Sequence, residues 1–299
     1  MLLHDLMNKR TALMVPIIGA MTFGLYPACI QAAYAEGANV SFVVITTTFF
    51  RALTLAIFCL LTSKSILPRP GDLRPFLSGG FCQALSIIGI LGSLMFLPGP
   101  VTVILMFTHT IMLLFYMAYR GEIRLSTLAV LSTLCALFGV SLVVDVWHHL
   151  HNLPWIGVGL AMMSAFATLT RLYVFGKQTQ HTNPAVVGAQ TFLMATVCTL
   201  PLAFFMAPLP PQSWLGIAAL SGSCLSLALG TFAMFYGIWL VGSFQFSLMA
   251  KLEPVFTAIF SFLILGQVLN FWQYIGMALV IGSLVAYQYF EQRPEAASV

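Results

Sequence analysis

Charged residues inside apolar runs are the first candidates for chemistry in this chain. Arg51, Lys251 and Glu253 each lie within a stretch of mostly apolar residues. If such a stretch crosses a bilayer, a charge near its middle costs roughly 2.5–3.5 kcal/mol, so each charge is a candidate functional group. Lys251 would bind an anionic substrate group, such as a carboxylate, or a neighbouring helix would neutralise it. The sequence leaves both alternatives open.

The pair Glu253-Pro254 follows Lys251 almost directly. Two residues apart on a helix, Lys251 and Glu253 point about 200° from each other, so they need not pair. Glu253 would carry a proton or hold a partner helix, and we favour the structural role. Pro254 frees a backbone carbonyl one turn earlier, which predicts a kink. Arg51 is interpreted as a structural donor or gating residue.

Further polar side chains lie in the middle of apolar runs. His109 would hydrogen-bond a substrate, titrate during proton-linked transport, or join two helices, and the last is the commoner use of such a histidine. Gln83, Gln190 and Gln245 would line a polar cavity or hydrogen-bond between helices. We place Gln83, Gln245 and His109 among the candidate substrate ligands, and Gln190 among the structural ones.

Tyr26, Tyr236 and Trp239 are candidate aromatic walls of a substrate cavity. Such rings stack on planar or apolar substrate groups, but they also serve as lipid-facing packing or an interfacial belt. The chain contains 25 Phe, so any pocket in it would be partly aromatic by chance.

The sequence lacks the motifs of familiar enzymes. It contains no G-x-x-x-x-G-K-[ST], H-E-x-x-H or G-x-S-x-G pattern. The His148-His149-Leu150-His151 run lacks accompanying cysteine or carboxylate ligands, and the six cysteines form no close pairs. We therefore expect no catalytic residue, no cofactor and no metal. The rival interpretation is a membrane enzyme or lipid flippase with an atypical site.

Composition indicates which elements position these residues. Only 7% of residues are charged and 60% are hydrophobic, whereas a soluble domain has about 25% charged residues. The surface must therefore face membrane lipid. The net charge of +4 does not indicate nucleic-acid binding, because the basic residues are scattered between apolar runs.

The apolar runs predict ten transmembrane helices, each of roughly 20 residues. The predicted spans are 12–34, 40–62, 75–97, 101–119, 125–146, 155–176, 184–207, 214–240, 243–265 and 271–290.

Lysine and arginine predict the orientation, because cytoplasmic loops are enriched in both. With the N-terminus in the cytoplasm, ten of the twelve fall in cytoplasmic segments and none in outer loops. The ten are Lys9, Arg10, Lys64, Arg69, Arg74, Arg120, Arg124, Arg171, Lys177 and Arg293. We therefore expect a multi-pass protein with both termini cytoplasmic.

The two halves of the chain resemble each other, with Arg51 and Gln190 at similar depths. The sequence Gly121-Glu122 ends the fourth span, and Gly266-Gln267 ends the ninth. Five spans per half insert the second copy upside down. We therefore predict an all-α membrane fold of two inverted five-helix repeats, residues 1–146 and 147–299, with a site near the midplane.

The segment 252–258, LEPVFTA, running on to Gly266-Gln267, resembles the ninth-helix signature of the drug/metabolite transporter superfamily. Within it the chain looks like an EamA-type exporter, and Gly121-Glu122 and Arg51 match the first repeat. The resemblance implies two five-helix EamA repeats in the inner membrane. It also implies a secondary transporter that exports a small molecule by alternating access.

The chain departs from the family pattern at several positions. Thr108-His109-Thr110 replaces a frequent Pro-Val, Gln267 replaces glutamate, and Lys251 is not required by the pattern. EamA relatives export amino acids, metabolites and drugs, and aromatic amino-acid exporters match best in length and architecture. We expect export of amino acids or related metabolites, with proton coupling as an option. A carrier of drugs, other metabolites or lipid-linked substrates is the alternative.

Overall fold

The structure is a computed structural model that describes residues 9–67, 73–94, 96–97, 99–149, 153–265 and 268–291. Every regular element in these ranges is a helix. The predicted Gly266-Gln267 ending of the ninth span lies outside the described residues. In order, the helices are α2 Lys9–Ala35, α3 Val40–Leu61, α4 Leu73–Leu94, α5 Gly99–Phe107, α6 His109–Tyr119, α7 Thr127–Val143, the 3₁₀ turn η2 Val146–His149, α8 Trp155–His181, α9 Pro184–Thr199, α10 Leu202–Phe205, α11 Trp214–Val241, α12 Ser243–Met249, α13 Leu252–Leu265 and α14 Phe271–Glu291.

The predicted class, an all-helical membrane protein, is confirmed. Six helices of the described chain are long and apolar enough to cross a bilayer. They cover Ala12–Ala35, Val40–Leu61, Val101–Tyr119 (most of α5 together with α6), Trp155–His181, Pro184–Phe205 (α9 together with α10) and Trp214–Val241. The other predicted spans also contain helices, but the number of ten crossings remains a prediction.

Large apolar side chains cover the outside of the bundle. Leu60 and Leu61 of α3 and Val285 of α14 are among those exposed, at 68%, 81% and 61%. Contiguous exposed apolar surface is rare on soluble monomers, whereas lipid solvates it well. The exposed surface therefore agrees with the composition.

The predicted spans 101–119 and 243–265 each contain a short break between two helices, and the first is still long and apolar enough to cross a bilayer as a whole. The first breaks at Thr108, whose hydroxyl donates to the Leu105 carbonyl oxygen at 2.6 Å. The second breaks at Ala250-Lys251. Pro254 explains the second break, because its nitrogen cannot donate to the carbonyl four residues earlier, that of Ala250.

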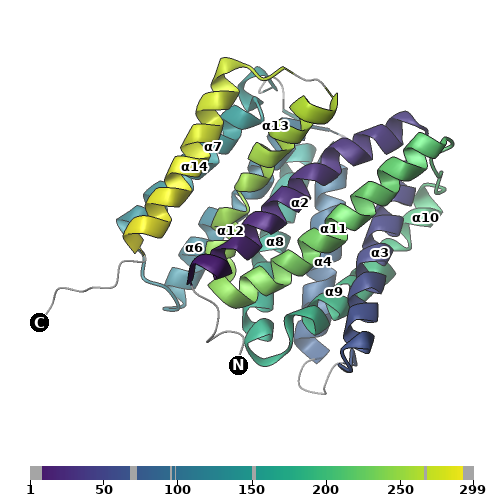
Figure 1. Cartoon of the computed structure of the whole chain (residues 1–299), viewed down its shortest axis with the longest axis horizontal. Coiled ribbons are helices and arrows are strands. Elements are labelled where there is room, and N and C mark those ends of the chain that lie inside the picture. Colours follow the sequence, from purple (N-terminus) through teal and green to yellow (C-terminus); the bar gives the residue numbers. More distant parts are fainter. Residues whose placement is uncertain are drawn as a thin grey trace, which may run out of the picture.

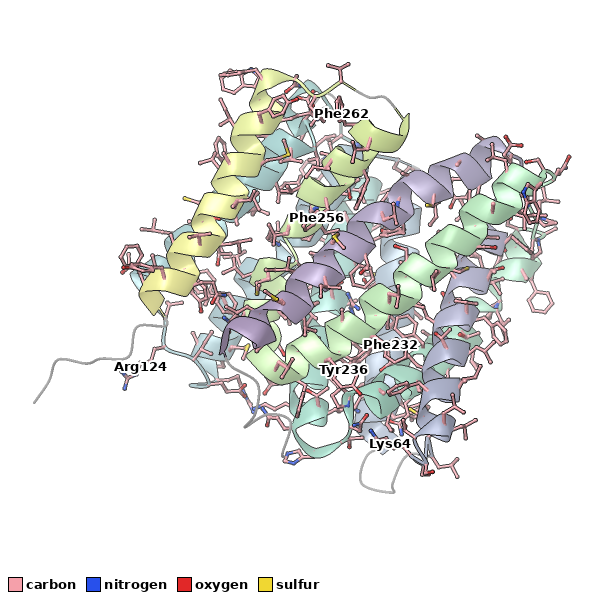
Figure 2. All side chains as sticks on the ribbon, viewed as in Figure 1. Lys64, Arg124, Phe232, Tyr236, Phe256 and Phe262 are labelled. Carbon is pink, nitrogen blue, oxygen red and sulfur yellow. The ribbon has the colours of Figure 1, made fainter. Side chains whose placement is uncertain are left out.

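The helices pack mainly in long pairs. The N-terminal α2 lies along α11, α4 along α8, α3 along α9, and α7 along α14 (Figure 1). Hydroxyl groups join the α4–α8 pair, where the Ser86 and Thr168 oxygens are 2.8 Å apart. Phe256 of α13 packs on α2 at Gly24, where an added Cβ would lie 2.5 Å from the Phe256 Cβ (Figure 2).

The α7–α14 pair depends on two facing glycines. A Cβ added to Gly276 of α14 would lie 2.6 Å from the Gly139 carbonyl oxygen of α7. One added to Gly139 would lie 2.9 Å from the Gly276 oxygen. Small residues let transmembrane helices approach closely enough for dispersion contacts to hold them together. Residues larger than glycine at either position would separate the two backbones.

We therefore expect Gly276→Leu to destabilise the protein by about 1–3 kcal/mol through overpacking. The matched control is Gly282→Leu on the same helix, because an added Cβ there meets nothing within 4 Å. Thermal unfolding of the purified proteins in detergent, at one scan rate, measures the difference. Equal melting temperatures for the two variants would contradict this account of the pair.

Candidate functional site

A cavity of about 260 Å³ lies where the two interrupted helices meet. Its described lining residues come from α2, α3, α4, α5, α6, α8, α9, α11, α12 and α13. Neither α7 nor α14 contributes a described lining residue. A cavity enclosed by this many helices resembles the usual ligand site of helical bundles.

The cavity extends from the middle of the bundle toward one end. Its lining includes Tyr34, one residue before the end of α2, and Val43, near the start of α3. No described lining residue lies in the last ten residues of α3, after Arg51. The cavity therefore approaches the Ala35–Val40 end of the bundle and not the other.

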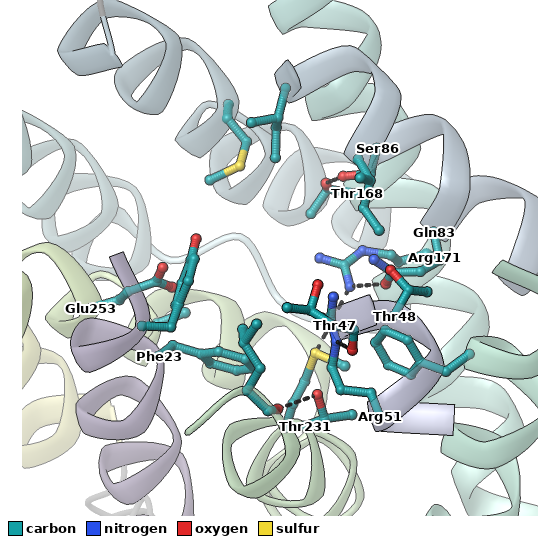
Figure 3. A pocket seen from close by; sticks show the side chains of 18 of the residues that line it. Phe23, Thr47, Thr48, Arg51, Gln83, Ser86, Thr168, Arg171, Thr231 and Glu253 are labelled. Atoms are coloured by element: carbon teal, nitrogen blue, oxygen red, sulfur yellow. Dashed lines mark hydrogen bonds between the residues drawn. The ribbon is translucent and has the colours of Figure 1, made fainter. Parts of the chain in front are cut away.

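Arg171 of α8 is the central charged group of one wall. Its Nη1 donates to the Gln83 Oε1 of α4 at 2.6 Å (Figure 3). Its Nε is buried and has no hydrogen-bond partner among the described residues. Thr48 of α3 lines the same cavity, and its hydroxyl is buried without a partner too. Buried polar groups are normally satisfied, so this wall has unused donor capacity.

Arg51 supplies a second guanidinium to this side of the cavity. Its Nε donates to the Thr47 carbonyl oxygen at 3.1 Å, one turn earlier on α3. Its guanidinium carbon lies 4.5 Å from the centre of the Phe192 ring of α9. The ring and the backbone bond hold Arg51 in place, as a cation–π contact does at partly desolvated sites.

Glu253 of α13 supplies the negative charge of the cavity. Figure 3 shows it beside Phe23, across the cavity from Arg171 and Thr48. Within the described part of the chain, its carboxylate makes no hydrogen bond and no ion pair within 4 Å. A carboxylate placed on a cavity wall without a partner is available to a ligand.

Lys251 lies outside the cavity lining and is 0% exposed. Its Nζ donates to the Phe107 carbonyl oxygen at 2.9 Å and to the Thr110 hydroxyl at 2.6 Å. It also lies 4.1 Å from the centre of the Phe107 ring. The Thr110 oxygen is 2.8 Å from that of Ser247. Lys251 thus joins the break in one interrupted helix to the break in the other.

His109 lies on the cavity wall beside this network and is 4% exposed. Its Nδ1 is 2.8 Å from the Met106 carbonyl oxygen, and its Nε2 is 3.5 Å from the Thr110 hydroxyl. Both ring nitrogens therefore face protein groups.

The remaining predicted residues divide between cavity and packing. The cavity brings together Tyr26, Arg51, Gln83, His109 and Glu253. Elsewhere, Gln245 donates to the Gln288 Oε1 at 3.0 Å, and Gln190 donates to the Ile66 carbonyl oxygen at 2.8 Å. Residues outside the cavity lining are Lys251, Gln190, Gln245, Tyr236, Trp239 and Pro254. Tyr236 and Trp239 form an edge-to-face pair with ring centres 6.4 Å apart.

Arg171 was wrongly assigned to a cytoplasmic segment. It lies inside α8, ten residues before the helix ends at His181. The sequence contained the needed information, because position 171 falls within the apolar run 155–176. Thr48 offered no such indication, since threonines are common in membrane helices.

A polar cluster lies at the end of the bundle opposite the Ala35–Val40 end that the cavity approaches. The Glu122 carboxylate, after α6, accepts from the Lys177 Nζ of α8 at 3.0 Å and from the Tyr173 hydroxyl at 2.8 Å. Tyr173 packs edge-to-face on Tyr116 of α6. Partial burial favours a higher pKa for Glu122, but the bonds from Lys177 and Tyr173 outweigh it and hold the pKa below its ordinary value.

A metal site is not indicated within the described chain, where no three His, Cys, Asp or Glu residues gather in a suitable group. The six cysteines are free thiols.

Comparison with known proteins agrees with this architecture. Residues 155–287, from α8 into α14, match the EamA-like transporter family. This match supports placement in the drug/metabolite transporter superfamily. A solved crystal structure of 16% identity aligns with 97% of this chain and 100% of its own, with a TM-score of 0.81, which shows a shared fold. None of the curated proteins compared with the chain matches it.

The geometry of Lys251 predicts the effect of removing its charge. Lys251→Met would leave the Phe107 carbonyl and the Thr110 hydroxyl without their donor, at a cost of about 1–3 kcal/mol. We expect a lower melting temperature in detergent, while Lys64→Met, at the end of α3, serves as the control. If Lys251 instead contacts substrate, Lys251→Met would keep the normal melting temperature and lose transport.

Proposed function

We propose that the protein is a secondary transporter that exports amino acids or related small metabolites across the cell's inner membrane by alternating access. One observation carries the proposal: positive and negative groups face a common cavity at the meeting point of two interrupted helices. Discontinuous helices at the bilayer midplane are the usual construction of substrate sites in secondary transporters. The EamA-like domain supports the same class.

The helix pairing supports two inverted repeats, 1–146 and 147–299. In such a fold α2 corresponds to α8, α3 to α9, α4 to α11 and α7 to α14. A two-fold axis relating the halves would turn the α2–α11 pair into the α8–α4 pair. It would also place α3 against α9 and α7 against α14. All four pairs pack extensively, and the interrupted helices correspond as well.

Transport by purified protein tests the function. We expect proteoliposomes loaded with one of several neutral amino acids (phenylalanine, tyrosine, leucine and threonine) to exchange it for labelled external amino acid. Protein-free liposomes are the control, and a parallel series with an imposed pH gradient tests proton coupling. If no amino acid of this panel crosses the bilayer, the proposed substrate class is wrong.

The orientation of the chain rests on its basic residues. After the correction of Arg171, nine of the twelve Lys and Arg residues remain in the segments assigned to the cytoplasm. Lys64 and Arg124 lie toward the same end of the bundle, away from Phe262 (Figure 2). Both termini are therefore proposed to be cytoplasmic, and the cavity to face outward.

Cysteine labelling of intact cells checks this orientation. In a variant without the six natural cysteines, we expect an impermeant maleimide to label Gln212→Cys but not Lys64→Cys. The Gln212 backbone N–H donates to the Glu36 carbonyl oxygen, which places this residue at the Ala35–Val40 end of the bundle that the cavity approaches. Labelling at Lys64 but not at Gln212 would reverse the topology.

Alternating access requires the closed end to open. We propose that the Glu122–Lys177 pair holds this end shut in the outward-facing state. The pair is partly exposed, so its contribution is at most about 1 kcal/mol. Since the folded-state pKa of Glu122 is lowered, the contribution is complete above about pH 5 and is lost as pH falls through the folded pKa.

The pair predicts a shift between conformations. In inside-out vesicles, Glu122→Lys should speed maleimide labelling of a cysteine placed at Ala250 on the cavity wall, by up to about fivefold. The exchanged pair, Glu122→Lys with Lys177→Glu, should restore slow labelling. If the single and double variants label at the same rate, the pair does not hold the closed end.

A further inference from the structure

We propose that the cavity binds its substrate as an α-amino acid zwitterion, with the carboxylate on Arg171 and Thr48 and the ammonium on Glu253. The inference rests on the proposed function and assigns the polar groups of that site. It concerns which end of the substrate each wall recognises.

The carboxylate assignment follows from the unused donors of Arg171. A guanidinium has five N–H donors, and its Nε–Nη2 edge forms two parallel bonds with a carboxylate. In this structure Gln83 occupies Nη1, which fixes the rotation of the group. Nε has no partner within the described ranges, and no hydrogen bond involves Nη2 there. The free edge is the one suited to a carboxylate.

Thr48 extends this binding wall. Its hydroxyl lines the same cavity and is buried without a partner. An unsatisfied hydroxyl costs free energy that a bound acceptor would recover. A carboxylate has two oxygens and about four acceptor positions, enough for the Arg171 edge and for the hydroxyl of Thr48.

Glu253 is the complementary group for the substrate ammonium. Its carboxylate faces the cavity without a bonded partner in the described chain, although Lys251 lies only two residues earlier. Lys251 is already committed to Phe107 and Thr110. An ammonium brought by the substrate would therefore be the partner of Glu253. In the low dielectric of the bundle such a pair is stronger than in water.

The rest of the lining fits an apolar side chain. It includes Phe23, Ile30, Ile87, Ile90, Met106 and Leu227. These residues add no charge, so the three charged groups among the described lining residues, Arg51, Arg171 and Glu253, act on the polar end of the substrate. A neutral amino acid satisfies both kinds of surface.

The experiment uses analogues that lack one charge each. Exchange of labelled phenylalanine is measured in proteoliposomes, with phenylalanine amide and 3-phenylpropionate as competitors. The amide lacks the carboxylate, and the propionate lacks the ammonium. In the unchanged protein both should compete about tenfold or more weakly than phenylalanine, because each leaves a buried charged group unpaired.

Two variants should each weaken the binding of phenylalanine but differ in which analogue they affect. Arg171→Gln should weaken the apparent affinity for phenylalanine and for 3-phenylpropionate by about 10- to 100-fold. It should leave the apparent affinity for the amide unchanged. Glu253→Gln should weaken phenylalanine and the amide and leave 3-phenylpropionate unchanged. Arg124→Gln, exposed and outside the cavity lining, is the control for Arg171 and should alter none of the three.

Thr48→Val tests the same assignment with a smaller change. It removes the hydroxyl at nearly constant volume and should follow the Arg171→Gln pattern more weakly. Thr54→Val on the same helix, whose hydroxyl bonds to the Phe50 carbonyl and does not line the cavity, is its control. Thr48→Val therefore keeps the test decisive if Arg171→Gln does not fold.

The outcomes separate the inference from the proposed function. If phenylalanine exchanges but each variant weakens all three compounds equally, the assignment of substrate ends is wrong while the transporter function stands. If Arg171→Gln weakens competition by the amide and Glu253→Gln weakens competition by 3-phenylpropionate, the substrate binds in the reverse orientation and the inference fails. If no amino acid of the panel exchanges in the unchanged protein, the proposed function fails, and the inference fails with it.

Discussion

The contact on which the rest of the structure depends is the bond from the Lys251 ammonium to the Phe107 carbonyl at the end of α5. Two helices stop in the interior of the protein, and each leaves carbonyl and amide groups without the partners of a continuous helix. In lipid such groups must be satisfied by protein. The Lys251 side chain, at the break between α12 and α13, donates to the Phe107 carbonyl oxygen at the break between α5 and α6. It also donates to the Thr110 hydroxyl of α6. The cavity forms around this crossing.

Two cations near the cavity differ in whether protein groups already occupy their donors. Lys251 donates to two protein oxygens and lies outside the lining, whereas Arg171 keeps an edge free within it. The arginine geometry matters here, since one nitrogen can be fixed by Gln83 while the opposite edge stays available. A lysine at position 171 would offer a single nitrogen for both tasks.

The sequence predicts most of the frame and part of the site, and the difference has a physical cause. Apolar run length locates the helices, and Pro254 locates one break, because a missing amide is a local property. The break at Thr108 has no proline, and its single hydroxyl bond would be tolerated in most helices. The hydrogen-bond partners of Lys251 and Arg171 depend on which atoms the neighbouring helices place beside them. Lys251 bonds to a residue 141 positions away and Arg171 to one 88 positions away, so sequence pattern alone does not predict either contact.

The α7–α14 pair lies outside the cavity lining and is held by two facing glycines. The need for small residues where two helices meet therefore applies to α7 and α14, whereas the need for groups that bind substrate applies to the helices that line the cavity. Changes of substrate preference can accumulate on the lining helices without loosening the pair. Substitutions on the outer faces of α7 and α14 can likewise adapt the protein to a different lipid composition without changing which substrates the cavity binds. The fold thus separates adaptation to a membrane from adaptation to a substrate.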